Sequence, residues 1–89
     1  MTADEHALLR ERTRERMRLR VLPIAAPSRS CAGPATGKVC ACCDRPILAP
    51  EPEFELEFAR PDALGRKTLW MHTSCDAIWY CERMRIQQR

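Results

Sequence analysis

Two pairs of soft ligand residues are the most informative feature of this 89-residue sequence. Cys40 and Cys43 form a Cys-x-x-Cys pair, and His72 and Cys75 form a His-x-x-Cys pair. Zinc binds thiolate and imidazole groups tetrahedrally, and a Cys-x-x-Cys turn brings two thiolates to one metal. The spacing therefore predicts one structural Zn²⁺ held by three cysteines and one histidine, with no coordination position left open for water.

The other cysteines leave alternatives to this ligand set. Cys42 adjoins Cys43, so Cys40 and Cys42 would be a second choice of pair, although two intervening residues suit the tight turn around tetrahedral zinc better. We expect Cys31 to be a free thiol, because it has no partner at metal spacing, and Cys81 to be a small buried apolar group. Six cysteines would also permit three disulfides, which is the main alternative to zinc.

Length and composition favour a small domain that needs a bound metal ion or disulfide bonds for stability. Chains this short seldom stabilise a core without a metal or disulfides. No apolar segment before a small-residue cleavage site marks a secretory signal, and no stretch approaches the ~20 apolar residues of a membrane span. We therefore expect a cytoplasmic protein without membrane contact, in which reduced thiols favour metal over disulfides.

Two strands and a helix are expected to position the ligands. The segment 53–58 alternates acidic and apolar residues, which is typical of a half-buried strand, and 67–71 is a candidate return strand of the same β-hairpin. A helix then starts after His72, with Thr73 as its N-cap and Cys75 in its first turn. Its packing face is predicted to consist of Cys75, Ile78, Trp79 and Ile86. On the first strand, the expected inward residues are Phe54, Leu56 and Phe58, and the expected outward residues are Glu51, Glu53, Glu55 and Glu57.

A charged helix is predicted before this module, over residues 2–21, with Thr2 as N-cap and Glu5 completing a capping box. Its apolar stripe is thin, so we expect a separate, mostly solvated helix; the stripe comprises Leu9, Thr13, Met17 and Val21. Residues 23–37 are rich in proline, glycine and small side chains, which is typical of an extended linker. The expected organisation is a charged helix at 1–22, a linker at 23–37 and a zinc-binding domain at 38–89, and we expect the domain to fold without residues 1–30.

The order of a knuckle, a hairpin and a helix whose first turn carries ligands resembles a treble-clef zinc finger. The His-x-x-Cys pair is similar to the closing half of a LIM-type site, and the segment as a whole is similar to small uncharacterised bacterial zinc-binding proteins. The resemblance covers residues 38–86 and implies a small α+β zinc-stapled domain with Cys40, Cys43, His72 and Cys75 as ligands. Two departures from a LIM domain are the 28 residues between the ligand pairs and the lack of a second ligand set.

The sequence favours a binding function over catalysis. A Cys-x-x-Cys redox motif needs a βαβ context that is not predicted here, and a catalytic zinc needs an open coordination position. We therefore expect no enzymatic activity and a protein-interaction or adaptor module. The alternative is a nucleic-acid-binding zinc finger, because the net charge of +3 resides in residues 1–30. Its phosphate contacts would come from Arg10, Arg12, Arg14, Arg16, Arg18 and Arg20.

Overall fold

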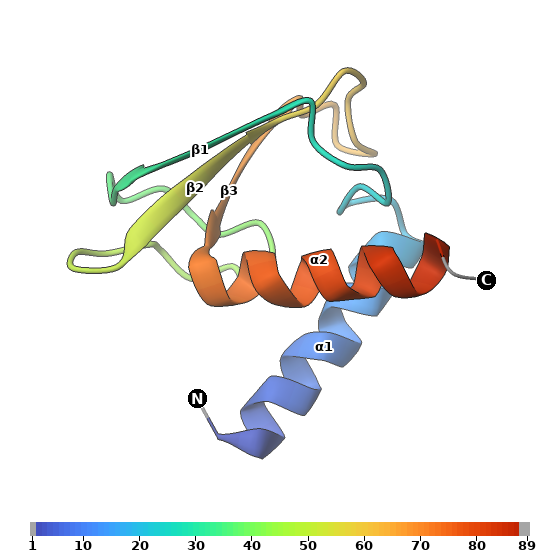
Figure 1. Ribbon diagram of the computed structural model, residues 1–89, viewed down its shortest axis with the longest axis horizontal. Helices are drawn as coiled ribbons and strands as arrows, with labels where there is room; N and C mark the ends of the chain where they lie inside the picture. Colours follow the sequence, from blue (N-terminus) through green and yellow to red (C-terminus); the bar gives the residue numbers. More distant parts are fainter. Residues whose placement is uncertain (1, 88–89) are drawn as a thin grey trace.

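The computed structural model describes residues 2–87 and consists of two helices and a three-stranded sheet (Figure 1). The elements are, in chain order, α1 (Ala3–Arg18), β1 (Arg29–Pro34), β2 (Pro52–Glu57), β3 (Thr68–His72) and α2 (Thr73–Gln87). The outer ends of the predicted segments 1–22 and 38–89 lie outside the described residues. The fold is thus a small α+β arrangement, as the sequence predicts, with the sheet on one side and the helices on the other (Figure 1).

The predicted hairpin is formed by β2 and β3, which pair antiparallel. Leu56 lies opposite Leu69, and Phe54 lies opposite Met71. Leu56, Leu69 and Met71 are buried and belong to the core on which α2 packs. The ring of Phe58 meets the ring of Trp79 edge-on, with 5.9 Å between their centroids. The alternation of the sequence therefore places the apolar side chains on the face that α2 covers.

Strand β1 is the element that the sequence did not predict. Residues 29–34 were expected to belong to an extended linker, but they pair along their whole length with β2, with Cys31 opposite Glu55. All of its residues except Gly33 are exposed. A strand at a sheet edge is held by backbone hydrogen bonds and can be exposed on both faces. Such a strand does not show the alternation of apolar and polar residues that predicts a half-buried strand.

The acidic face of β2 is less uniform than expected. Glu53 is buried, with 6% of its surface exposed, whereas Glu51 and Glu55 are exposed. The prediction that Glu53 faces solvent is therefore wrong. Its Oε1 accepts a hydrogen bond at 2.7 Å from Oγ1 of Thr36, which follows β1 in the chain.

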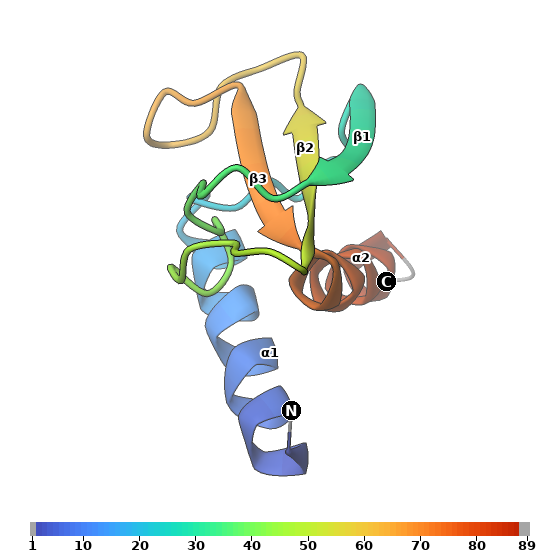
Figure 2. The same cartoon turned by 90° about the vertical axis from the view of Figure 1, so that its left-hand side faces the viewer.

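Helix α1 begins as predicted, because the Glu5 amide donates to the Thr2 side chain at 3.1 Å. It ends at Arg18, however, and Arg20 takes a left-handed conformation with φ of 63°. The expectation of a separate, solvated helix is wrong: Thr13 and Met17 are buried at 0% and 1% exposure. Helix α1 lies beside α2 and beside the loop that carries residues 40–43 (Figure 2). Met17 belongs to the same core as Cys40 and Cys42 of that loop, so the thin stripe is buried.

Helix α2 buries Cys75, Ile78 and Trp79, as expected, but Ile86 remains 38% exposed. The buried face continues instead through Glu82 and Arg83. The Arg83 guanidinium lies over the Trp79 ring, 4.1 Å from its centroid, and thereby covers the indole. Within residues 2–87, neither helix has the length and apolar character needed to cross a membrane.

Candidate metal centre

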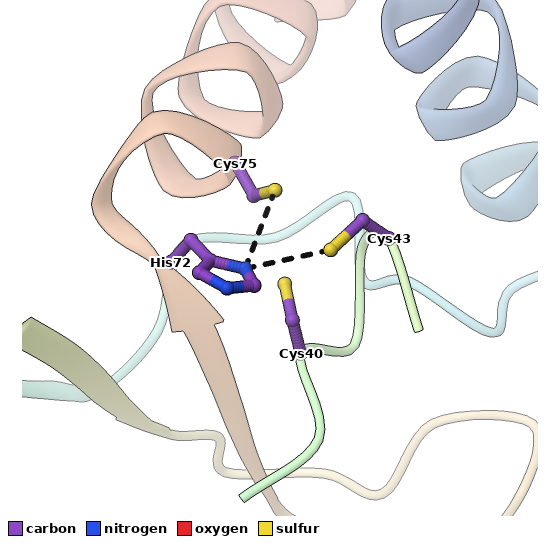
Figure 3. A group of neighbouring side chains, drawn as sticks. All are labelled: Cys40, Cys43, His72 and Cys75. Carbon is purple, nitrogen blue, oxygen red and sulfur yellow. Dashed lines mark hydrogen bonds between the residues drawn. The ribbon is translucent and has the colours of Figure 1, made fainter. Parts of the chain in front are cut away.

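The structure brings the two predicted ligand pairs together (Figure 3). One ligand atom from each of Cys40, Cys43, His72 and Cys75 lies within 4.8 Å of all the others. Cys40 and Cys43 come from the loop before β2, His72 ends β3, and Cys75 lies in the first turn of α2. Cys43 is half-buried, and the other three are buried. The group thus joins three parts of the chain at one point beneath the sheet.

The knuckle that carries Cys40 and Cys43 is shaped by backbone hydrogen bonds. The Asp44 amide donates to the Cys40 carbonyl, and the Cys40 amide donates to the Arg45 carbonyl, both at 2.9 Å. Asp44 adopts a left-handed conformation with φ of 63°, which aspartate tolerates better than most residues. The Ala41 amide donates to the Trp70 carbonyl at 2.8 Å, so the knuckle is fixed to the strand that ends in His72.

His72 presents one ring nitrogen to the sulfur atoms and the other to a carboxylate. Its Nδ1 lies 3.4 Å from Cys43 Sγ and 4.0 Å from Cys75 Sγ (Figure 3). Its Nε2 lies 3.9 Å from Glu51 Oε1. A ligating histidine commonly directs its second N–H at a carboxylate or carbonyl, which fixes the tautomer. Nδ1 is therefore the nitrogen that this geometry offers to a metal.

The thiol groups are close enough to share protons. A hydrogen bond with the Cys75 side chain, opposed by burial and assisted by backbone amides, lowers the pKa of Cys40 to about 4. The same hydrogen bond raises the pKa of Cys75 far above its ordinary value, and burial raises the pKa of Cys43. Three thiolates in so small a space repel one another, so without a cation some of the thiols stay protonated. A bound metal ion would displace these protons and offset the repulsion.

The size of the group fits a tetrahedral metal site. Metal–sulfur bonds of ~2.3 Å place tetrahedral ligand atoms roughly 3.5–4 Å apart, and the four atoms here lie within 4.8 Å of one another. Thiolate and imidazole are donors for borderline-soft ions rather than for calcium or magnesium. The residues present therefore fit a metal ion with four protein ligands.

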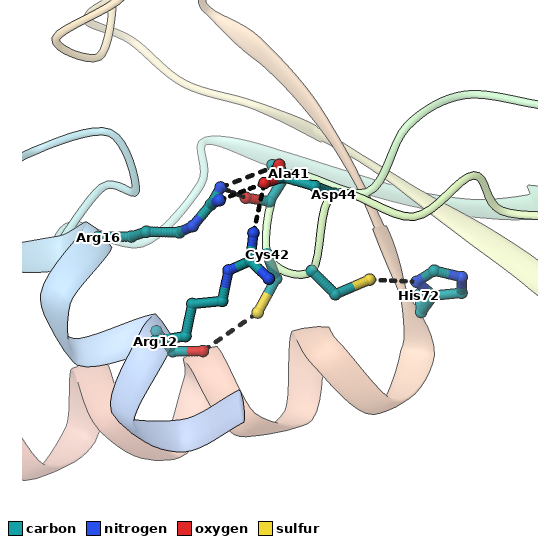
Figure 4. A network of polar contacts seen from close by, with 8 residues as sticks. Arg12, Arg16, Ala41, Cys42, Asp44 and His72 are labelled. Carbon is teal, nitrogen blue, oxygen red and sulfur yellow. Dashed lines mark hydrogen bonds and ion pairs between the residues drawn. The ribbon is translucent and has the colours of Figure 1, made fainter. Parts of the chain in front are cut away.

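The remaining cysteines are not among these four ligand residues, although a hydrogen bond with the Cys75 side chain lowers the pKa of the Cys42 thiol. Cys42 points toward α1, where its Sγ lies 3.1 Å from Thr13 Oγ1 (Figure 4). Cys31 is an exposed free thiol on β1, as expected. The prediction that Cys81 is buried is wrong, because it is exposed on α2, on the side that faces a groove between the helices. All six cysteines are free thiols in the structure.

The sequence did not reveal that α1 braces the knuckle. Arg12 and Arg16 both pair with the carboxylate of Asp44, and Arg16 also donates to the Ala41 carbonyl at 3.0 Å (Figure 4). The hydrogen bond from Arg16, followed by the charges of Arg16 and Arg12, outweighs burial and lowers the pKa of Asp44. The only sequence signal was the spacing of four between the two arginines, which puts them on one face of a helix.

A cleft of about 460 Å³ lies beside the candidate metal centre. Its metal side is formed by Cys43, His72 and Cys75, and the facing wall by the first half of α1, including Leu8 and Leu9. Leu8 is 66% exposed. The half-buried position of Cys43 follows from this opening.

Comparison of the chain with models of protein families, with curated proteins and with solved structures finds no match. The candidate site therefore stands on its own geometry.

Proposed function

We propose that this protein is an interaction or adaptor module whose fold is held together by one structural Zn²⁺. The observation that carries the proposal is the convergence of four soft ligand atoms within 4.8 Å from two pairs separated by 28 residues in the sequence. Zinc is the ion we assign, because a Cys₃His set with tetrahedral dimensions is typical of structural zinc sites. Three thiolate ligands suit a reducing compartment such as the cytoplasm.

We assign no catalytic role to this metal. A catalytic zinc keeps one position for water or substrate, whereas four protein ligands fill a tetrahedral ion. The knuckle, the β2–β3 hairpin and the ligand-bearing start of α2 support a treble-clef-like arrangement, to which β1 and α1 are additions. A stapled scaffold of this kind leaves function to its surfaces.

Binding to a protein has more support than binding to nucleic acid. Five arginines of α1 and the turn after it already donate to protein carboxylates or carbonyls, namely Arg12, Arg14, Arg16, Arg18 and Arg20. Arg10 is exposed. Four of these guanidinium groups pair with carboxylates, which reduces the positive charge available to phosphates. Helix α1 also contains no Phe, Tyr or Trp on which a base would stack.

Metal analysis and binding measurements on the full chain test this function. We expect one tightly held zinc ion per chain, and a strong chelator should remove it with loss of the circular-dichroism spectrum. The zinc-loaded protein should capture a protein partner that a Cys75→Ser variant does not capture. Purified protein that is folded without metal, or that binds duplex DNA tightly and with a steep salt dependence, would overturn the proposal.

A further inference from the structure

A groove of about 560 Å³ lies between α1 and α2. The two helices diverge toward the N-terminus of α1 (Figures 1 and 2). Charged and polar side chains of α1 form one wall, and α2 contributes the floor and the other wall. The residues that line it are His6, Arg10, Arg14, Ser74, Ala77, Ile78, Cys81, Glu82 and Arg85.

A buried carboxylate orients two arginines at the edge of this groove. The side chain of Glu82 is 4% exposed, and its Oε2 accepts hydrogen bonds from Arg14 Nε at 2.8 Å and Arg85 Nε at 3.1 Å. Burial raises the pKa of Glu82, but the bonds and charges of the two arginines outweigh it, so the pKa is lowered and the group stays ionised. Because both arginines bond the same oxygen, their guanidinium groups lie side by side.

The two arginines retain donors for a ligand. Each uses its Nε for Glu82, and a guanidinium carries further N–H groups on its two terminal nitrogens. A planar guanidinium fork matches a carboxylate in a bidentate manner. Arg10 lies one helical turn before Arg14 and lines the same groove, so the lining carries three arginines against one glutamate.

The floor between these charges is small and apolar. Ala77, Ile78 and Cys81 lie on the face of α2 that lines the groove, and Ala77 and Cys81 are exposed. None of the lining residues is Phe, Tyr or Trp, so the groove lacks the large aromatic side chains on which bases usually stack. An aliphatic side chain would cover this floor and remove it from water.

We propose that the groove binds an acidic segment of a partner protein, with carboxylates on the Arg14/Arg85 pair and an aliphatic side chain on the Ala77/Ile78/Cys81 floor. This inference rests on the proposed interaction function and names the partner's chemistry. Positive walls around an apolar floor are complementary to an acidic segment that carries one or two leucines. Glu82 acts as a positioning residue, because its carboxylate orients the two guanidinium groups.

A synthetic peptide tests the groove directly. The probe is a fluorescein-labelled peptide with two leucines, four residues apart, flanked by glutamates, and its controls replace leucine by serine or glutamate by lysine. We expect zinc-loaded wild-type protein to bind the probe but neither control. Arg85→Ala should weaken binding at least about tenfold, as expected for a lost charge-assisted hydrogen bond. The matched control Arg60→Ala, at an exposed loop position, should bind as wild type does.

Cysteine alkylation locates the bound peptide. Cys81 lines the groove, and Cys31 is exposed on β1, outside its lining. Saturating peptide should slow maleimide modification of Cys81 severalfold and leave Cys31 unchanged, as measured by mass spectrometry of the zinc-loaded protein. Glu82→Gln should weaken peptide binding while the metal content stays at one ion per chain.

Three results would overturn the inference. The first is that the lysine control binds as strongly as the probe, and the second is that duplex DNA binds more tightly than the peptide. The third is that the protein sediments as a dimer that Arg85→Ala dissociates, which would mean that a second copy fills the groove. Failure of the groove and failure of the proposed function are distinguishable. A protein partner captured equally by wild type and Arg85→Ala would remove the groove and keep the interaction function. A folded, metal-free protein without any partner would remove both.

Discussion

The knuckle at 40–43 is held from two sides, and the two attachments differ in kind. Toward β3 and α2 it meets His72 and Cys75 in a compact group of soft ligands. Toward α1 it makes weaker contacts, namely the Cys42 thiol on Thr13 and the Asp44 carboxylate between two arginines. A metal ion held by these four side chains would supply a large free energy of folding, whereas the α1 attachment adds several smaller contributions around one buried methionine.

We therefore expect the group of soft ligands to decide whether the chain folds, and the contacts of α1 to decide only how that helix is placed. Loss of one metal ligand should be felt by the whole module, whereas changes at α1 should reduce stability in steps.

The largest effect is expected from removal of a metal ligand. Cys75→Ser or His72→Ala should abolish tight zinc binding and unfold the module, because structural zinc contributes ~10–16 kcal/mol of apparent binding free energy in small fingers. Metal analysis and circular dichroism measure both outcomes. Cys31→Ser, at an exposed thiol outside the group, is the matched control and should retain metal and fold. Cys42→Ser should retain zinc. If this variant lost zinc, Cys40 and Cys42 would be the ligand pair instead of Cys40 and Cys43.

A smaller but substantial effect is expected at the core residue of α1. Met17 is 1% exposed and packs in the core, so Met17→Ala should reduce the free energy of unfolding by about 2–5 kcal/mol. Chemical denaturation of the zinc-loaded protein measures this value. Leu8→Ala, at a residue that is 66% exposed, should change stability little. Equal effects of the two variants would mean that α1 does not pack as described.

The same packing leads to a prediction for a shortened chain. Met17 and Leu22 belong to the core, and Trp79 Nε1 donates to the Pro23 carbonyl at 2.8 Å. We therefore expect the fragment 31–89 to be less stable than the full chain at equal zinc concentration, in contrast to the independent domain expected from the sequence. A fragment with the denaturation midpoint of the full chain would contradict this.

A moderate effect is expected at the contact between Thr13 and Cys42. Thr13→Val keeps the shape of the side chain but removes the hydroxyl, which donates to the Leu9 carbonyl at 2.7 Å and lies 3.1 Å from Cys42 Sγ. The loss of these two hydrogen bonds should cost about 1–3 kcal/mol, with the zinc content unchanged. Thr68→Val, at a half-buried strand position, is a control for the change in β-branched side chain. A variant that loses zinc would show that Thr13 supports the metal ligands directly.

The smallest effect is expected at the exposed ion pairs. Asp44→Asn removes the carboxylate that both Arg12 and Arg16 contact, and exposed pairs contribute about 0.2–1 kcal/mol. The difference in unfolding free energy between wild type and variant should shrink as salt is added, because exposed charges are screened. A difference that is independent of salt would show that Asp44 acts through its left-handed backbone rather than through its charge.

The sequence by itself determined the parts of the protein that depend on local spacing. The candidate ligand residues follow from Cys-x-x-Cys and His-x-x-Cys, the β2–β3 hairpin from alternating apolar residues, and the start of α1 from its capping residue. Each of these patterns reflects geometry within a few residues, namely a turn around a tetrahedral ion, a pleat of period two and the free amides of a helix end.

The tertiary structure alone decided what lies against these elements. The strand β1 carries no apolar period, and its place beside β2 depends on backbone hydrogen bonds that any residue with an N–H can make. The burial of Glu53, the bracing of Asp44 by α1 and the exposure of Cys81 depend on residues far away in the sequence. Contacts between residues distant in the sequence leave no periodic pattern in a single sequence. The groove between α1 and α2 depends on such contacts, so the sequence alone does not predict it.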